Sequence, residues 1–284
     1  MSLFGLDPFW ATAYTFVIAL CVGSFLNVVI YRIPIMMQRE WDEQLGNKET
    51  DPASTEPFNL SVPASTCTRC NHKIRWFENI PVLSYLFLKG RCSECKSAIS
   101  FRYPCIELLS AITASFAVYT YGFNEISLAV ILLTSGLICL IFIDIDHQLL
   151  PDRITLPLLW LGLFVNSFGM FTSIHSAVYG AIAGYLSLWS IYWIFKLLTG
   201  KEGMGYGDFK LLAALGAWAG IGQLPLIILL SSLVGAILGI LMILFKKHGR
   251  ETPIPFGPYL AIAGWIAIFW GHQITSTYLQ LLRF

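Results

Sequence analysis

Two aspartates beside long apolar segments are the residues of this 284-residue chain best suited to chemistry. Asp144 follows an apolar run that ends at Ile143, and Asp208 ends the segment Gly203–Asp208, just before another apolar run. Ionisable groups at such positions are costly, so they usually serve a function. Two aspartates brought together there would share a proton. Such a pair can activate water for attack on a peptide carbonyl and protonate the leaving amine.

These carboxylates also have plainer interpretations. Asp208 could cap the helix that follows it, and we expect Asp152 to cap the helix after Pro151. Asp144 and Asp146 are about 200° apart around a helix, so only one of them can face a given partner. From the residues alone, a catalytic pair of Asp144 and Asp208 and a proton-coupled transporter, which also uses intramembrane carboxylates, both stay open.

A second group of chemically capable residues is a pair of Cys-x-x-Cys motifs. The four cysteines are Cys67, Cys70, Cys92 and Cys95. This spacing lets four thiolates surround Zn²⁺ in a tetrahedron, as in zinc ribbons. Two disulfides or an iron–sulfur cluster are the alternatives, and a reducing cytosol would disfavour the disulfides. Because sulfur fills all four positions, we expect the zinc to organise a loop and not to catalyse a reaction.

The composition places these residues in a membrane protein. Apolar residues make up 56% of the chain and charged residues only 12%, against about 25% charged in soluble domains. A water-soluble enzyme and a disordered protein are therefore excluded. Seventeen of the 35 formal charges lie between Pro34 and Tyr103, so one polar module is inserted into an apolar chain. Basic and acidic residues are mixed there, and we expect no nucleic-acid partner.

Eight apolar segments are candidates for membrane-spanning helices. They cover residues 11–32, 104–121, 126–143, 154–171, 176–196, 209–222, 224–245 and 258–281. The sixth is short and rich in glycine and alanine, which permits close helix packing within a membrane. The predicted fold is therefore an all-α polytopic membrane protein of about eight helices, with a zinc-binding loop domain between the first and second.

The basic residues predict the orientation of these helices. With eight spans, 17 of the 18 lysines and arginines fall on one side of the membrane, and only Arg283 falls on the other. Basic residues concentrate on the cytoplasmic side of membrane proteins. The loop domain is therefore expected in the cytoplasm and both termini outside it.

Taken together, the motifs resemble those of a known family. They are Gly23–Val29 with Arg32 and Pro34, the two cysteine motifs, Asn79–Pro81 with Ser84 and Tyr85, Gly90–Cys92, Arg102–Pro104 with Glu107, Asp144–Asp152, Gly205–Asp208 and Pro255–Pro258. In this order they resemble the bifunctional bacterial type IV prepilin leader peptidase/N-methyltransferase family, which are membrane aspartic proteases of the GxGD class. Thr68 is a departure, since many members have proline after the first cysteine, but the four cysteines are intact.

The resemblance implies a protease. Asp144 and Asp208 would be its catalytic pair, and Gly205 and Gly207 would support the motif around Asp208. The substrates would be type IV prepilins or pseudopilins, whose basic leader is cut after a glycine at the cytoplasmic face of the membrane. Such a protein would serve type IV pilus biogenesis, type II secretion or both.

The resemblance also implies a second activity. The new N-terminus would be methylated with S-adenosylmethionine as the methyl donor. This activity is associated in the family with the cysteine-bearing loop, so Gly90 and its neighbours are candidate residues. Glu107, the remaining carboxylate within a predicted span, has no role that its spacing assigns, although it belongs to the motif set.

These inferences predict three parts and one location. Residues 1–33 would form the first membrane helix, 34–103 the cytoplasmic loop with its four-cysteine zinc module, and 104–284 a seven-helix peptidase core. The protein would lie in the bacterial inner membrane, in contact with the lipid bilayer and with both termini in the periplasm.

Overall fold

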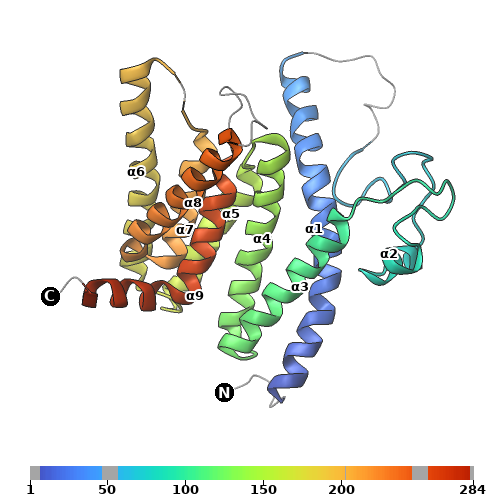
Figure 1. Ribbon diagram of the computed structural model, residues 1–284, viewed down its shortest axis with the longest axis horizontal. Helices are drawn as coiled ribbons and strands as arrows, with labels where there is room; N and C mark the ends of the chain where they lie inside the picture. Colours follow the sequence, from blue (N-terminus) through green and yellow to red (C-terminus); the bar gives the residue numbers. More distant parts are fainter. Residues whose placement is uncertain (1–6, 47–56, 202, 245–254, 282–284) are drawn as a thin grey trace. The chain divides into compact units, whose positions relative to one another are not determined.

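The computed structural model describes residues 7–46, 57–201, 203–244 and 255–281, and this part of the chain is mainly helical (Figure 1). The α-helices are α1 (Pro8–Gln44), α2 (Leu83–Phe87), α3 (Arg102–Tyr121), α4 (Glu125–His147), α5 (Asp152–Ser167), α6 (Ile174–Thr199), α7 (Tyr206–Ala219), α8 (Leu224–Leu244) and α9 (Gly257–Leu281). Two short 3₁₀ helices are η2 (Trp76–Asn79) and η3 (Ile221–Gln223). The chain divides into two compact units, residues 1–139 and 140–284.

Every predicted span overlaps a helix, so the predicted all-α fold is confirmed. The segments Pro8–Gln44, Glu125–His147, Ile174–Thr199 and Ile221–Leu241 are long and apolar enough to cross a membrane. The other predicted spans lie on α3, α5, α7 and α9. Five basic residues that entered the orientation argument lie outside the described residues: Lys48, Lys246, Lys247, Arg250 and Arg283.

In the first unit, α1 and α3 pack along each other. The helix α1 begins at Pro8 because the Asp7 side chain accepts a hydrogen bond from the N–H of Phe9. Gly23 allows the two helices to approach closely, since a Cβ at this position would lie 2.6 Å from the Cα of Glu107. This contact fixes the register between α1 and α3.

The first helix is longer than its predicted span, because it continues from residue 32 to Gln44. The returning chain packs on this extension. The guanidinium of Arg32 donates hydrogen bonds to the carbonyl oxygens of Asn59 (2.8 Å) and Pro63 (2.6 Å), and that of Arg39 lies 4.5 Å from the centre of the Phe58 ring. These contacts are made by residues far along the chain, so the apolar run alone does not predict them.

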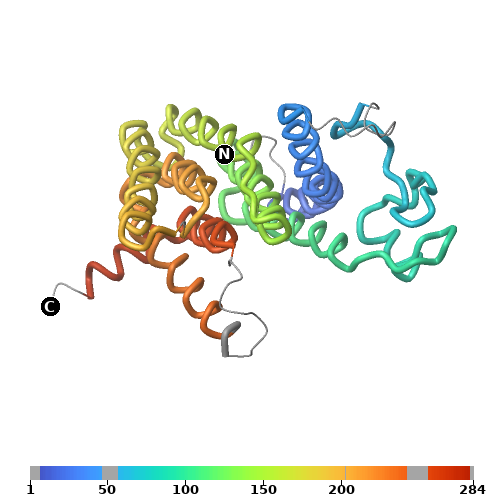
Figure 2. Tube along the Cα trace, turned by 90° about the horizontal axis from the view of Figure 1, so that it is seen from above, coloured from blue at the N-terminus to red at the C-terminus, as the bar shows by residue number. Residues whose placement is uncertain are grey.

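In the second unit, α7 is packed among α5, α6 and α9, as the view from above shows (Figure 2). Small residues make this possible: the backbones of Gly180 in α6 and Gly216 in α7 are in direct contact. The indole N–H of Trp218 donates to the carbonyl oxygen of Leu158 in α5 at 2.8 Å. The predicted close packing of the sixth span is confirmed, and Asp208 in the first turn of α7 is held by a well-packed helix.

Candidate functional site

The two predicted catalytic aspartates both lie in the second unit, each at the end of a helix. Asp144 is in the last turn of α4 and Asp208 is in the first turn of α7. They are only 5% and 7% exposed. One oxygen of Asp144 (Oδ2) accepts a hydrogen bond of 3.0 Å from the backbone N–H of Gly257, at the start of α9. Three helices therefore contribute to this site.

A single leucine links the surroundings of the two aspartates. A Cβ on Gly207, the residue before Asp208, would lie 2.7 Å from the Cβ of Leu150. A Cβ on Gly257 would lie 3.0 Å from Cδ2 of the same leucine and 2.6 Å from Oδ2 of Asp144. The structure therefore brings the predicted pair together around Leu150.

The two carboxylates differ in what holds them. Asp144 has its hydrogen bond from Gly257, whereas Oδ1 of Asp208 is buried without a hydrogen-bond partner among the described residues. Gly205 leaves space beside Asp208, since a Cβ there would be 3.8 Å from Oδ2. Two adjacent buried carboxylates share a proton readily, so one can accept a proton while the other donates one. This is the arrangement that acid–base hydrolysis requires.

An apolar pocket lies beside the segments that carry these glycines. Its lining includes Leu188, Met204, Ile228, Phe256 and Tyr259. Met204 precedes Gly205, and Phe256 precedes Gly257, so both glycine segments contribute to the pocket wall. The pocket offers an apolar side chain a place next to the aspartate site.

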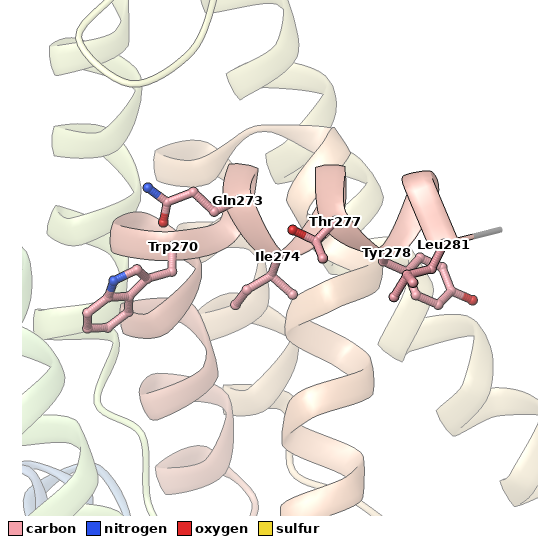
Figure 3. Close-up of a pocket in the computed structure, with 6 residues that line it drawn as sticks. All are labelled: Trp270, Gln273, Ile274, Thr277, Tyr278 and Leu281. Carbon is pink, nitrogen blue, oxygen red and sulfur yellow. The ribbon is translucent and has the colours of Figure 1, made fainter. Parts of the chain in front are cut away.

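A second hollow lies along the C-terminal turns of α9 (Figure 3). It is lined by Trp270, Gln273, Ile274, Thr277, Tyr278 and Leu281. These residues recur at the spacing of one face of a single helix, and the lining contains neither aspartate. We assign this hollow no chemistry.

Asp152 does not have the predicted role. Pro151 occupies the capping position of α5, and the Asp152 side chain is instead paired with Lys210 of α7. The ammonium nitrogen of Lys210 lies 2.7 Å from both carboxylate oxygens. The ion pair joins the first turns of α5 and α7, and no spacing rule predicts it because 58 residues separate the partners.

The four predicted cysteine ligands come together in the first unit. Their sulfur atoms all lie within 4.8 Å of one another. The Cys67–Cys95 and Cys70–Cys92 sulfur pairs are each 3.9 Å apart. Four sulfurs at about 2.3 Å from a tetrahedral zinc would be about 3.8 Å apart, whereas a disulfide requires about 2.05 Å. The donor set and its geometry therefore fit a metal site with four thiolate ligands.

The cluster is built from two copies of one backbone turn. In the first, the N–H of Cys67 donates to the carbonyl oxygen of His72; in the second, the N–H of Cys92 donates to that of Ser97, both at 2.9 Å. The residues after each second cysteine, Asn71 and Lys96, share a φ of 56°. Isolated β-bridges join Thr66 to Lys73 and Arg91 to Ala98. All these pairs are related by a shift of 25 residues.

The turns also favour the thiolate form that a metal needs. Hydrogen bonds from the backbone N–H groups of Arg69 and Cys70 lower the pKa of the Cys67 thiol to about 6. The hydroxyl and backbone of Ser97 lower the pKa of Cys95. The Cys70 thiol shifts the other way: a hydrogen bond from the backbone N–H of His72 lowers its pKa, but burial and hydrogen bonds with the other thiols raise it to about 12. Without a metal, the cluster therefore holds thiolates at Cys67 and Cys95 beside a protonated thiol at Cys70.

Gly90 and Glu107 each make a structural contact with the segment around α2. Gly90 has a φ of 66°, and a Cβ there would lie 2.9 Å from the Tyr85 ring. The Glu107 carboxylate (Oε2) accepts a hydrogen bond of 2.8 Å from the backbone N–H of Val82. Neither residue is part of the aspartate site or the cysteine cluster.

Gly257 is the main site residue without a role among the sequence-based predictions. It belongs to the quoted segment Pro255–Pro258, and glycine between prolines was the only available signal. Its contact with Asp144 spans 113 residues, so no local pattern indicates it.

Comparison with known proteins gives a consistent assignment. Residues 17–121 match the model of the bacterial peptidase A24 N-terminal domain, and residues 131–240 match the type IV leader peptidase family. A prepilin leader peptidase/N-methyltransferase from Stutzerimonas stutzeri is 58% identical, over 94% of this chain and 93% of the relative. Proteins of the same name from Pseudomonas aeruginosa and Neisseria gonorrhoeae are 57% and 51% identical, covering 95% and 92% of this chain and 94% and 91% of the relatives.

No solved structure matches the chain significantly. The two family models nevertheless cover both compact units, and the relatives are matched over nearly their whole length. The chain therefore belongs to the prepilin leader peptidase/N-methyltransferase family.

Proposed function

We propose that this protein cleaves the leader peptide of type IV prepilins or pseudopilins and then methylates the new N-terminus. The observation that carries the peptidase assignment is the buried pair Asp144 and Asp208 around Leu150. No described residue makes a hydrogen bond to Oδ1 of Asp208, so this atom is available to a water molecule or a substrate. The names of the relatives supply the substrate class.

In the proposed reaction, Asp144 and Asp208 share one proton. The ionised carboxylate takes a proton from water, and the water oxygen attacks the scissile carbonyl carbon. The protonated carboxyl donates to the carbonyl oxygen as the tetrahedral intermediate forms. When the carbon–nitrogen bond breaks, the leaving amine takes a proton from the pair. The hydrogen bond from Gly257 holds Asp144 in place during these transfers.

The pocket beside the glycine segments suggests which part of the substrate would lie there. Met204 and Phe256 adjoin the two glycine segments and present apolar surface. A prepilin continues into an apolar helix after its cleavage site, according to the family resemblance. The pocket would therefore receive an apolar side chain next to the scissile bond.

For the second activity, S-adenosylmethionine would be the methyl donor and residues 34–103 the part of the chain associated with it. Cys67, Cys70, Cys92 and Cys95 would hold one structural Zn²⁺, supported by their sulfur separations. With four protein ligands, the metal stabilises the loop without an open coordination position. Gly90 stays a candidate neighbour of the methyl donor.

The proposed location is the bacterial inner membrane, with the cysteine loop in the cytoplasm and both termini in the periplasm. The lysine and arginine distribution supports this orientation. Residues 1–33 would act as the first membrane helix and 104–284 as the peptidase core, which contains both aspartates.

The test uses the purified full-length protein, a prepilin and labelled S-adenosylmethionine, with cleavage and methyl transfer measured together. Asp144→Asn and Asp208→Asn should each abolish cleavage while methylation of a pre-cleaved pilin persists. Asp146→Asn is the matched control, because this exposed aspartate is two residues from Asp144. Normal cleavage by either of the first two variants would exclude the assigned pair.

A further inference from the structure

The short segment Trp76–Phe87, comprising η2, its connection and α2, exposes apolar side chains that neither proposed activity uses. Trp76 and Phe87 are 81% and 83% exposed, and Leu83 and Leu86 are 52% and 63% exposed. Leu83, Leu86 and Phe87 follow at the i, i+3 and i+4 spacing of one helix face. Contiguous exposed apolar groups of this size mark an interaction surface.

The opposite side of α2 is anchored to the cysteine module. The hydroxyl of Tyr85 donates to the carbonyl oxygen of Ile99 at 3.4 Å, and its ring packs on Gly90. The ring of Tyr85 also lies edge-on to that of Phe101, with centres 6.2 Å apart. The exposed face of α2 is therefore held in a defined direction.

A hydrogen bond sets the depth of this segment relative to the first unit's membrane helices. The N–H of Val82, just before α2, donates to the carboxylate of Glu107. Glu107 lies inside the predicted span 104–121 and packs on Gly23 within the predicted span 11–32. At 1.5 Å per residue, Gly23 is about 30 Å from the end of α1 at Gln44. Figure 1 likewise shows α2 at about the level where α3 crosses α1, far from that end.

The backbone conformation of Val82 indicates that tertiary contacts, and not local preference, hold the start of α2 in place. Its φ of 59° is left-handed, which is unfavourable for a β-branched residue. The hydrogen bond from its N–H to Glu107 is the contact that offsets the cost of this conformation. The start of α2 is therefore held at the depth of Glu107, which lies within a predicted membrane span of α3.

The charge around this segment also suits a membrane surface. Residues 57–103 contain seven basic residues and two acidic ones. One of the two acids, Glu78, is occupied by the backbone N–H of Arg75 (2.9 Å) and by His72 (3.1 Å). Six of the basic residues are exposed: Arg69, Lys73, Arg75, Lys89, Arg91 and Lys96. Basic residues beside exposed aromatic and aliphatic side chains are typical of binding to anionic lipid surfaces.

We propose that the segment Trp76–Phe87 lies in the boundary between headgroups and acyl chains of a bilayer containing anionic lipids. Trp76, Leu83, Leu86 and Phe87 insert into this boundary, and the surrounding basic residues contact the headgroups. The cysteine module is thereby held against the membrane by a lipid contact of its own. The inference requires membrane placement of α1 and α3 but no particular reaction at the aspartates.

The test is photo-crosslinking of the full-length protein in nanodiscs of phosphatidylethanolamine and phosphatidylglycerol. Separate variants carry Leu86→p-benzoylphenylalanine and Phe87→p-benzoylphenylalanine. The matched control is Leu45→p-benzoylphenylalanine, since Leu45 is also an exposed leucine (73%) but follows the far end of α1. Unchanged leader cleavage by each variant shows that it is folded.

The expected result is several-fold more lipid adduct from positions 86 and 87 than from position 45. Replacement of phosphatidylglycerol by phosphatidylcholine should lower the adduct yield at position 87. Equal lipid yields at the three positions, or adducts with protein alone, would overturn the proposal. It would also be overturned if added prepilin displaced the lipid adduct, because the surface would then bind substrate. An adduct yield independent of phosphatidylglycerol would refute the role of the charges.

Discussion

The cysteine cluster and the aspartate site solve the same problem, the convergence of reactive side chains, in opposite ways. The cluster lies within residues 67–95 and repeats one turn twice, with backbone hydrogen bonds inside each copy. The aspartate site joins residues as far apart as Asp144 and Gly257 and depends on packed helices. Cys70 and Cys95 are exposed, whereas both aspartates are buried.

This difference teaches where each site is vulnerable. The cluster's geometry comes from local turns, so we expect its stability to depend on the four thiols and on the metal that they would hold. The geometry of the aspartate site depends on glycines such as Gly207 and Gly257, where neighbouring side chains pack directly against the backbone. An added methyl group at either glycine is therefore expected to impair cleavage. Loss of a thiol is expected to destabilise the cysteine loop.

The largest expected effect is loss of the proposed zinc in Cys67→Ser. Structural zinc contributes about 10–16 kcal/mol of binding free energy in small zinc domains, so removal of a ligand should unfold the loop. Metal analysis should fall from about one zinc per chain to almost none, and methyl transfer to a pre-cleaved pilin should be lost. Cys21→Ser, at an exposed cysteine of α1, is the control. Full zinc occupancy in the Cys67 variant would contradict the four-thiolate site.

The next effect is expected from Gly257→Ala. The added Cβ would lie 2.6 Å from Oδ2 of Asp144, so the carboxylate must move. A displacement of about 1 Å at a catalytic group can cost about 10²-fold in rate, and kcat for leader cleavage should fall by this order. Zinc content should not change. Gly222→Ala is the matched control because nothing lies within 4 Å of its added Cβ; equal activity of both variants would refute the positioning role.

A smaller effect is expected from Gly207→Ala, whose Cβ would lie 2.7 Å from that of Leu150. Overpacking of this kind destabilises a fold by about 1–3 kcal/mol. Relief of this strain moves the segment that carries Asp208, and a loss of about 1.4 kcal/mol in transition-state stabilisation would lower the rate of cleavage about tenfold. The double variant Gly207→Ala with Leu150→Ala should recover part of the activity because the clash is removed. Strictly additive losses in kinetic assays would show that the two residues are uncoupled.

The smallest effect is expected at the ion pair between Asp152 and Lys210. Their side chains are 51% and 30% exposed, so solvent screens the interaction. A double-mutant cycle with Asp152→Asn and Lys210→Gln should give a coupling free energy of about 0.2–1 kcal/mol in unfolding experiments. Cleavage should stay close to that of the unsubstituted protein. A larger coupling would place this pair among the contacts that position α7.

The sequence predicts the helices and the cysteine cluster for identifiable reasons. Long apolar runs mark the membrane helices, and their ends agree with the structure to within a few residues at α3, α6 and α9. The cysteine cluster is readable because short, repeated spacing specifies a local turn. The pairing of Asp144 with Asp208 could only be proposed, since apolar surroundings indicate two costly carboxylates without showing that they meet.

Contacts between distant residues could not be predicted. Gly257 reaches Asp144 because α9 begins beside the end of α4, a consequence of packing. Glu107 finds its partner in the backbone of Val82, which has no side-chain signal. Arg32, at the end of the first predicted span, donates to the carbonyl groups of Asn59 and Pro63, and the sequence pattern does not indicate where these carbonyl groups lie.

The burial of α7 has a consequence for how this protein is made. Its 14 residues extend about 21 Å, less than the hydrocarbon thickness of about 30 Å, and nearly all from Asp208 to Trp218 are buried. During synthesis, α7 therefore has little lipid-facing surface with which to partition by itself. Its stable insertion depends on α5, α6 and α9. Because α9 follows the other three helices in the chain, the aspartate pair is completed only after α9 has been translated.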